Sequence, residues 1–258
     1  MNVPALFEVR GVTKTFRLPR SSFLRPPDLV VAVRDVSFQL SAGETLGVVG
    51  ESGSGKSTLM RLLLALEKPD QGEIVYRGEA LRREVQAVFQ DPVGALDPRM
   101  RVAQIVLEPL RVMRLPGDRR ARLLELLDAV GLPAAAAARY PHEFSGGQRQ
   151  RIAIARALAP RPRVLLADEP VSALDVSVRA QILNLLEDLR RGFGLTLVLV
   201  SHDLSVVRQM ADRVLVMQKG TVVESGATRE LFTSPRQPYT RTLLDSVPRL
   251  RKRRAAST

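Results

Sequence analysis

The eight residues from Gly50 to Ser57 constrain the fold and function of this chain more than any other stretch. Their sequence, Gly-Glu-Ser-Gly-Ser-Gly-Lys-Ser, fits the pattern G-x-x-x-x-G-K-[ST] of a phosphate-binding loop. Glycines let the backbone turn through positive φ and approach an anion closely, and successive N–H groups then point at that anion. Residues 45–49 before the loop are a short apolar run, and residues 58–66 after it are apolar at helical length. The sequence therefore predicts a strand, a phosphate loop and a helix whose N-terminus binds the anion.

This loop also predicts contacts for individual side chains. Lys56 is expected to reach the β- and γ-phosphates of a nucleotide, and the Ser57 hydroxyl to bind Mg²⁺. The other expected nucleotide-binding residues are Gly50, Glu51, Ser52, Gly53, Ser54, Gly55 and Thr58. An ordinary turn rich in glycine and serine is the alternative. The spacing of the glycines, the Lys-Ser pair and the strand-loop-helix setting together favour the phosphate loop.

Two carboxylates follow a second apolar strand. Residues 164–167 are Val-Leu-Leu-Ala, and Asp168 and Glu169 come directly after them. In a chain with a phosphate loop, this order is that of a Walker B strand, in which Asp168 helps to hold Mg²⁺. Glu169 is then aimed at the water that attacks the γ-phosphate, as a general base or a water-positioning group. A strand-end helix cap is the alternative, but a lone Asp fits that role better than an Asp-Glu pair does.

Composition and charge exclude several classes of protein. The 258 residues contain no cysteine, so disulfides, thiolate metal sites and a cysteine nucleophile are excluded. The longest apolar runs, such as residues 195–200, are far shorter than the ~20 residues that a membrane span needs, and the N-terminus lacks the features of a signal peptide. The net charge of +12 fits a nucleic acid or an anionic membrane as partner, or simply a GC-rich genome. Because the basic residues are scattered and not interleaved with aromatic ones, we expect no nucleic acid.

Strands and helices alternate along much of the chain. The expected strands are residues 7–16, 30–40, 73–76, 164–167 and 195–200, and the expected helices are residues 148–158, 178–190 and 204–210. The two strands nearest the C-terminus are apolar throughout, which is typical of a mostly parallel sheet covered on both faces. Residues 100–140 are rich in Ala, Leu and Arg and predict a helical subdomain. Within it, Pro133 is expected to end one helix and the alanines at 134–138 to start another.

A further motif precedes the helix at 148–158 and lies between the phosphate loop and the Walker B strand. It consists of Ser145, Gly146, Gly147 and Gln148. Its serine can cap the helix, and its glycines leave N–H groups free for a second anion contact. In this position the motif resembles the signature of ATP-binding cassette (ABC) ATPases. Other family elements are present in the expected order: Gln90 resembles the Q-loop glutamine, Asp175 the D-loop aspartate and His202 the switch histidine.

The resemblance implies the fold class and the domain organisation. It predicts an α/β P-loop NTPase of the ABC cassette type, with a mostly parallel core sheet, an antiparallel N-terminal β-subdomain and a helical subdomain. Residues 1–258 are then one nucleotide-binding domain, with the helical subdomain at about 92–158 and a C-terminal extension at about 227–258. The basic tail at 249–258 is expected to be disordered.

The resemblance also implies a composite site. ATP and Mg²⁺ are held between two cassettes that face each other head to tail, and the second cassette is either another copy or a different chain. Gln90 contacts Mg²⁺ and the attacking water, and His202 contacts the γ-phosphate. The signature motif and Asp175 serve the nucleotide bound on the facing cassette. Phe16 is the best candidate for the ring that stacks on adenine, with Phe23 as its competitor.

Several stretches imply an importer whose membrane part lies on other chains. Residues 139–144 lack the Gly-Glu-x-Gly element of many exporters, and residues 89–100, 172–178 and 234–244 resemble the ATP-binding subunits of bacterial dipeptide/oligopeptide and nickel importers. Such a subunit is an ATPase at the cytoplasmic face of the cell membrane, peripheral to it and bound to transmembrane permease subunits. A periplasmic or extracellular solute-binding protein is an indirect partner. A non-transport ABC ATPase, or a cassette of an enzyme complex such as carbon–phosphorus lyase, is the alternative.

Overall fold

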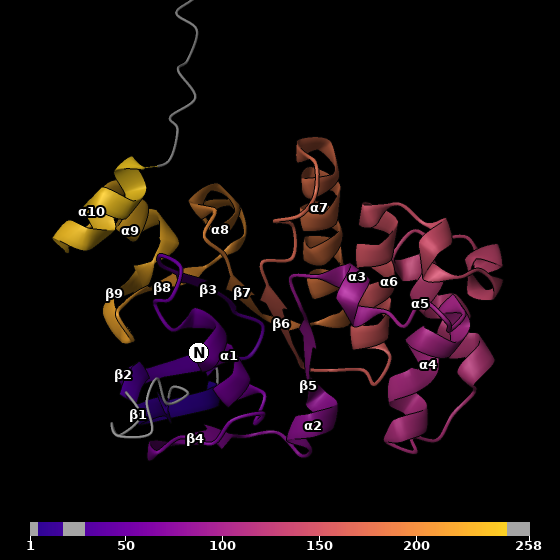
Figure 1. Cartoon of the computed structure of the whole chain (residues 1–258), viewed down its shortest axis with the longest axis horizontal. Helices are drawn as coiled ribbons and strands as arrows, with labels where there is room; N and C mark the ends of the chain where they lie inside the picture. The colour runs from indigo at the N-terminus through magenta and orange to yellow at the C-terminus, as the bar shows by residue number, and fades with distance from the viewer. Residues whose placement is uncertain (1–4, 18–28, 247–258) are drawn as a thin grey trace, which may run out of the picture.

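The computed structural model describes residues 5–17 and 29–246 (Figure 1). A six-stranded sheet forms the centre, with the strand order β5-β6-β7-β3-β8-β9. Its members are β5 (Val85–Val88), β6 (Val164–Asp168), β7 (Thr196–Val200), β3 (Thr45–Val49), β8 (Arg213–Gln218) and β9 (Thr221–Ala227). The first five strands are parallel, and β9 is antiparallel to β8. This confirms the predicted mostly parallel core sheet.

Burial on both faces explains why the central strands β3 and β7 are largely apolar. Every residue of β3 and β7 is buried, because helices or the second sheet cover both faces. The covering helices include α1 (Lys56–Leu63), α7 (Val176–Phe193) and α8 (Leu204–Met210). The phosphate loop therefore lies where the sequence predicts it, between the central strand β3 and α1.

A second sheet is antiparallel and consists of β2 (Leu29–Ser41), β1 (Ala5–Arg17) and β4 (Gln71–Tyr76), in that order. Alternate residues on one face of β1 and β2 are buried. Phe7 and Leu40, which are register partners, belong to the same buried cluster as Leu59 of α1 and Leu166 of β6. This shared core fixes the antiparallel sheet against the phosphate-loop helix, and the predicted N-terminal β-subdomain is confirmed.

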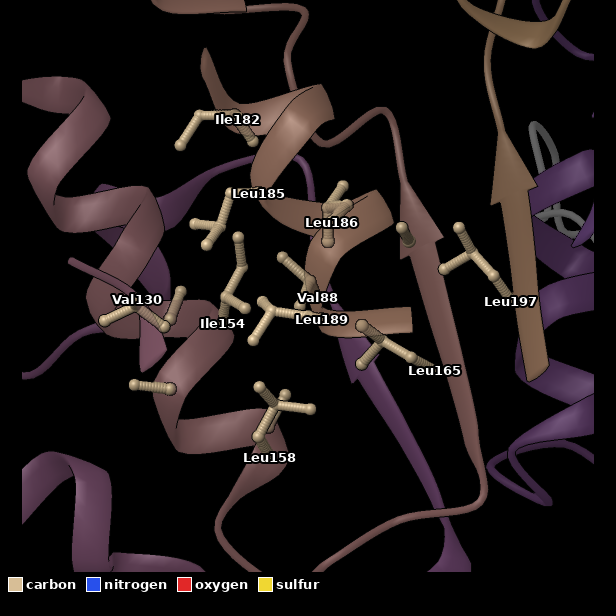
Figure 2. Close-up of a cluster of buried hydrophobic side chains, with 14 of the residues drawn as sticks. Val88, Val130, Ile154, Leu158, Leu165, Ile182, Leu185, Leu186, Leu189 and Leu197 are labelled. Atoms are coloured by element: carbon tan, nitrogen blue, oxygen red, sulfur yellow. The ribbon is translucent and has the colours of Figure 1, made fainter. Parts of the chain in front are cut away.

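The helical region lies on the far side of β5 and β6 from the antiparallel sheet (Figure 1). It contains α3 (Pro92–Ala95), α4 (Val102–Val112), α5 (Arg119–Ala129) and α6 (Gly146–Leu158). Figure 2 shows how side chains of α6 and α7 meet those of β6 in one buried cluster, which includes Ile154, Leu186 and Leu165. The four helices α3 to α6 all lie within residues 92–158. The boundaries of the helical subdomain remain a prediction.

The alanine run corrects one expectation. Residues Ala134–Ala138 form a 3₁₀ helix that ends at once, and a second 3₁₀ turn covers Pro141–Glu143 before α6 begins. The backbone turns back here because the carbonyl of Arg139 accepts the N–H of Val102 at the start of α4, at 2.9 Å. Short 3₁₀ segments are typical connectors between helices, and alanine content alone does not extend them.

After β9 the chain folds back through α9 (Thr228–Thr233) and α10 (Pro238–Asp245). Partly buried side chains of α10, among them Tyr239 and Leu243, pack against the main hydrophobic core. The sequence did not predict β8, β9 or these two helices. The basic tail at 249–258 lies outside the described residues. Within the described part of the chain, every helix is too short or too polar to traverse a lipid bilayer.

Candidate nucleotide site

The phosphate loop is held in a backbone conformation that requires its glycines. Gly50, Gly53 and Gly55 have φ of 152°, 78° and 105°. A Cβ on Gly50 would lie 2.2 Å from the carbonyl oxygen of Met217, and one on Gly55 would lie 2.2 Å from that of Ala32. The loop is thus pressed against β8 and β2, and no residue with a side chain fits at these two positions.

Lys56 is buried and folded back onto its own loop. Its Nζ donates to the carbonyl oxygens of Gly50 and Glu51, at 2.8 Å each. Burial lowers the pKa of the Lys56 ammonium, while Glu169 and Asp168 oppose that effect. Helix α1 begins at Lys56, and no side chain caps its N-terminus. Its first N–H groups are therefore available for an anion.

Asp168 and Ser57 form the candidate metal site. Asp168 ends β6 and accepts a hydrogen bond from the Ser57 hydroxyl; burial raises the pKa of its carboxyl, and the nearby Glu169 charge raises it further. A carboxylate and a hydroxyl side by side at a phosphate loop are the oxygen donors that Mg²⁺ takes together with substrate phosphates. The residues present thus fit a Mg²⁺ ion.

The ends of three adjacent parallel strands converge on Glu169. The side-chain amide nitrogen of Gln90, just after β5, donates to Oε2 of Glu169 at 3.0 Å. Nδ1 of His202, just after β7, lies 2.8 Å from Oε1 of the same carboxylate. Because β5, β6 and β7 are neighbours, their carboxyl ends bring these residues together from positions that are 79 and 33 residues apart in the chain.

Glu169 itself has an unusual backbone. Its φ is 46°, in the left-handed region that costs energy for a residue with a side chain. Its N–H donates to the carbonyl of Val200 in β7, and the hydroxyl of Ser172 donates to its carbonyl. These contacts hold Glu169 in a turn that aims its carboxylate toward the phosphate loop rather than along the strand.

These residues line one open cavity of about 1060 Å³. Its lining includes Ser52, Gly53, Gly55, Lys56, Ser57, Thr58, Gln90, Glu169 and His202 from the predicted set, and Leu29, Val30, Val31, Ala32, Arg34 and Lys219 in addition. No motif in the sequence points to a functional role for the start of β2. Yet Leu29 is 64% exposed and Val30 44% exposed, so β2 presents apolar surface at the cavity.

Phe16 lies beside this cavity rather than in its lining. It is the register partner of Val30 in the β1–β2 pair, and the Lys14 ammonium lies 5.5 Å from its ring centroid. Phe23 lies outside the described residues. Stacking of Phe16 on adenine therefore remains a prediction.

The signature motif lies elsewhere on the chain. The Ser145 hydroxyl accepts the N–H of Gln148 at 3.4 Å, so the motif starts α6 with a capping box. A Cβ on Gly147 would lie 2.4 Å from a methyl carbon of Val178, which explains this glycine by the close packing of α6 on α7. Gly146 lies close to Leu174, directly before the exposed Asp175 that starts α7.

Neither the signature motif nor Asp175 is among the residues that line the cavity. They form a second surface on the helical side of the chain, whereas the phosphate loop lies beside the antiparallel sheet (Figure 1). One chain thus brings together the phosphate loop, Asp168, Glu169, Gln90 and His202, and keeps the signature surface apart from them.

A phosphate loop between the central strand and the first helix of a mostly parallel sheet defines a P-loop NTPase. Comparison with known families goes further. The family model for the ABC transporter matches residues 33–172, and the model for the oligopeptide/dipeptide transporter C-terminal region matches residues 223–258. The chain belongs to the ABC transporter family of ATP-binding proteins and is an ATPase.

Several curated relatives are similar over most of this chain. The oligopeptide transport ATP-binding protein AppF of Bacillus subtilis is 48% identical over 98% of this chain and 81% of its own length. The dipeptide transport ATP-binding protein DppF of Haemophilus influenzae is 50% identical over 96% of this chain and 80% of its own length. The glutathione import ATP-binding protein GsiA of Escherichia coli is 51% identical over 94% of this chain, which spans only 41% of GsiA.

Solved structures confirm the cassette fold. CbiO1 from Clostridium perfringens, part of the ABC transporter complex cbiONQ, matches with a TM-score of 0.76 at 28% identity, over 89% of this chain and 91% of its own. The cassette MJ0796, in a dimeric post-hydrolysis state bound to ADP and Pi, matches with a TM-score of 0.73 at 32% identity, over 86% of this chain and 99% of its own.

Proposed function

We propose that this chain is the energy subunit of a bacterial ABC importer for peptides, at the cytoplasmic face of the membrane. The observation that carries the proposal is the carboxylate of Glu169, held by Gln90 and His202 beside a phosphate loop. This arrangement suits a water-activating group at the γ-phosphate end of a bound ATP. The oligopeptide/dipeptide C-terminal region and the names of AppF and DppF support the substrate class.

The chemistry follows from the placement of the side chains. The N–H groups of the loop and of the first turn of α1 bind the phosphates, and Lys56 turns an ammonium donor from its own loop to the β- and γ-phosphates. Ser57, Asp168 and Gln90 would hold a Mg²⁺ ion, which would supply positive charge against the phosphate oxygens. Glu169 accepts a hydrogen bond from the attacking water and orients it for in-line attack.

The site needs a second cassette to be complete. The signature motif and Asp175 are presented on a surface away from the cavity of their own chain, with exposed Ser145 and with Val176 82% exposed. A second cassette, of the same or another chain, places such a surface over the γ-phosphate. ATP then joins the two cassettes, and hydrolysis lets them separate.

The region around Gln90 is the proposed link to a permease. Phe89 beside it is 40% exposed, and α3 begins two residues after Gln90. A permease loop that contacts this segment moves Gln90 and, through its hydrogen bond, Glu169. Transport and hydrolysis are coupled in this way, with the solute-binding protein acting on the outer face of the permease.

The test is ATP hydrolysis by this chain assembled with its permease subunits and solute-binding protein in lipid vesicles. We expect hydrolysis to rise when the binding protein carries a di- or oligopeptide, and Lys56→Ala to abolish it. Lys68→Ala is the matched control, because Lys68 is exposed and outside the cavity. Hydrolysis that is indifferent to peptide, or that responds to DNA or RNA in a salt-sensitive way, contradicts the importer.

A further inference from the structure

The peptide unit that joins Gly50 to Glu51 is held from both edges. Its carbonyl oxygen, on Gly50, accepts a hydrogen bond from the Lys56 ammonium at 2.8 Å. Its N–H, on Glu51, donates to the phenolic oxygen of Tyr239 at 3.2 Å. The second contact spans 188 residues of sequence and connects the phosphate loop to α10.

Helix α10 presents this hydroxyl from a fixed position. The Glu224 carboxylate, in β9, accepts the backbone N–H groups of Arg236 and Gln237 at 2.8 and 3.1 Å, directly before α10 begins. Tyr239 is partly buried and packs against the main core together with Leu243 and Leu244 of the same helix. Packing of Tyr239 and the hydrogen bonds of Glu224 therefore hold the Tyr239 hydroxyl in place.

The start of the phosphate loop is where such a contact matters. Glu51, Ser52 and Gly53 are exposed, and exposed loop segments open more easily than packed ones. An ammonium has three donors, and Lys56 directs them at the carbonyls of Gly50 and Glu51, at 2.8 Å each, and at the Ser54 hydroxyl, at 3.5 Å. When a Lys56 donor turns to a phosphate, one of these hydrogen bonds to the loop is lost. The hydrogen bond from the Glu51 N–H to Tyr239 does not involve Lys56 and can persist when the nucleotide binds.

We propose that Tyr239 is a positioning residue of the nucleotide site, through which the C-terminal helix sets the affinity of the phosphate loop for ATP. Its hydroxyl keeps the Gly50–Glu51 peptide in the orientation that directs the following N–H groups into the cavity. A loop that is already ordered loses less conformational entropy when ATP binds, so its affinity for ATP is higher. The inference rests on the proposed nucleotide site at Gly50–Ser57.

The experiment compares Mg-ATP binding by the purified wild-type chain and by Tyr239→Phe, which removes only the hydroxyl. We expect the Kd for ATP to rise about two- to fivefold, within the range for one neutral hydrogen bond. The melting temperature without nucleotide should fall by no more than about 4 °C, and amide hydrogens of residues 50–57 should exchange faster. In the assembled importer the KM for ATP should rise while kcat is retained.

Thr242→Val is the matched control, because it removes a hydroxyl from an exposed position on the same helix, where that hydroxyl bonds only within α10. Glu224→Gln is the second variant. It weakens the anchor of α10, so we expect it to raise the Kd as well and to add little to Tyr239→Phe in the double variant.

The outcomes separate this inference from the proposed site. If Lys56→Ala loses ATP binding while Tyr239→Phe and Glu224→Gln bind like the wild type, the Tyr239 inference is overturned and the site stands. If Lys56→Ala also binds ATP like the wild type, the nucleotide site itself is misplaced. An equal effect of Thr242→Val shows a general loss of helix stability and also overturns the inference.

Discussion

Nδ1 of His202 lies 2.8 Å from Oε1 of Glu169. Because this nitrogen faces the carboxylate, the opposite ring nitrogen, Nε2, is the one left to face a nucleotide. Gln90 holds the other carboxylate oxygen at 3.0 Å, so side chains of this chain orient both oxygens of Glu169. The strained backbone of Glu169, with φ of 46°, is a further sign that its direction is determined by the surrounding structure.

Removal of the imidazole should therefore affect turnover more than binding. For His202→Ala we expect a loss of kcat of about a hundredfold or more, the usual contribution of a well-placed acid–base group, with little change in the Kd for ATP. Single-turnover hydrolysis and equilibrium ATP binding measure the two quantities. A variant that hydrolyses ATP at the wild-type rate contradicts the role of His202 at the γ-phosphate.

Arg179 should matter for turnover although it lies outside the cavity. Its guanidinium donates to the carbonyls of Leu174 and Ser172, at 2.7 and 3.1 Å, and one nitrogen lies 3.8 Å from the carboxylate of Asp203. It thus ties the segment after Glu169 to the segment after His202. For Arg179→Ala we expect kcat to fall on the order of tenfold, since small misplacements of reacting groups are costly.

Arg179→Lys serves as the comparison, because lysine keeps the charge but cannot make the paired contacts of the guanidinium. Both variants should bind ATP like the wild type. Full activity of Arg179→Ala in the assembled transporter shows that the two segments hold their positions without this residue.

Asp168 gives a prediction for the pH dependence of stability. Burial, and then the charge of Glu169, raise the pKa of Asp168 above its usual value. A raised pKa means that the folded protein binds this proton more tightly than the unfolded chain does. The contribution of Asp168 to stability is therefore present at low pH and is lost as pH rises through its folded pKa. At neutral pH the partly buried Asp168 side chain therefore stabilises the folded protein less than it does at low pH.

Asp168→Asn should consequently raise the melting temperature of the nucleotide-free protein at pH 7, by up to about 3 °C, the shift that about 1 kcal/mol produces in a domain of this size. The same variant should lose the stabilisation that Mg-ATP gives the wild type. The difference between variant and wild type should shrink toward pH 4. An Asp168→Asn protein that melts below the wild type at pH 7 contradicts this account of the carboxylate.

Gly147 tests the packing of the signature motif. A Cβ there would lie 2.4 Å from Val178, so Gly147→Ala should push α6 away from α7 and destabilise the protein by about 1–3 kcal/mol in denaturant unfolding. Val178→Ala makes room and should restore part of the loss. Gly192→Ala is the control: it is also helical, nothing lies within 4 Å of its added Cβ, and we expect it to be neutral or stabilising. Equal stability of Gly147→Ala and wild type contradicts the close packing.

Much of this fold could be predicted because its signals are local. The phosphate loop is a contiguous motif, and the helix at residues 204–210 has the predicted bounds in the structure. Residues of β3, β6 and β7 are mostly apolar because these strands are buried on both faces, and a short continuous apolar run in the sequence indicates such a strand. Strands β8 and β9 carry weaker patterns, since β9 is only partly buried and its pairing with β8 is a long-range property of the sheet.

The sequence motifs predict single residues of the site, but not which other parts of the chain line its cavity. No sequence pattern indicates that β2 lines the cavity with Val30 and Val31, because that depends on how the antiparallel sheet packs on α1. The contact of Tyr239 with Glu51 joins residues 188 positions apart in the chain and has no local signal. By contrast, the carboxyl ends of neighbouring parallel strands meet at one edge, so the convergence of Gln90, Glu169 and His202 follows from their places after β5, β6 and β7.

The most direct measurement of the central claim is ATP hydrolysis by the wild type and by Glu169→Gln, together with size-exclusion chromatography of each in Mg-ATP. The account predicts that Glu169→Gln binds ATP, does not hydrolyse it and forms an ATP-dependent dimer, either with itself or with a partner cassette added to it. Hydrolysis by Glu169→Gln at the wild-type rate would contradict the account, because the carboxylate that Gln90 and His202 hold would then not be the group that acts on the attacking water.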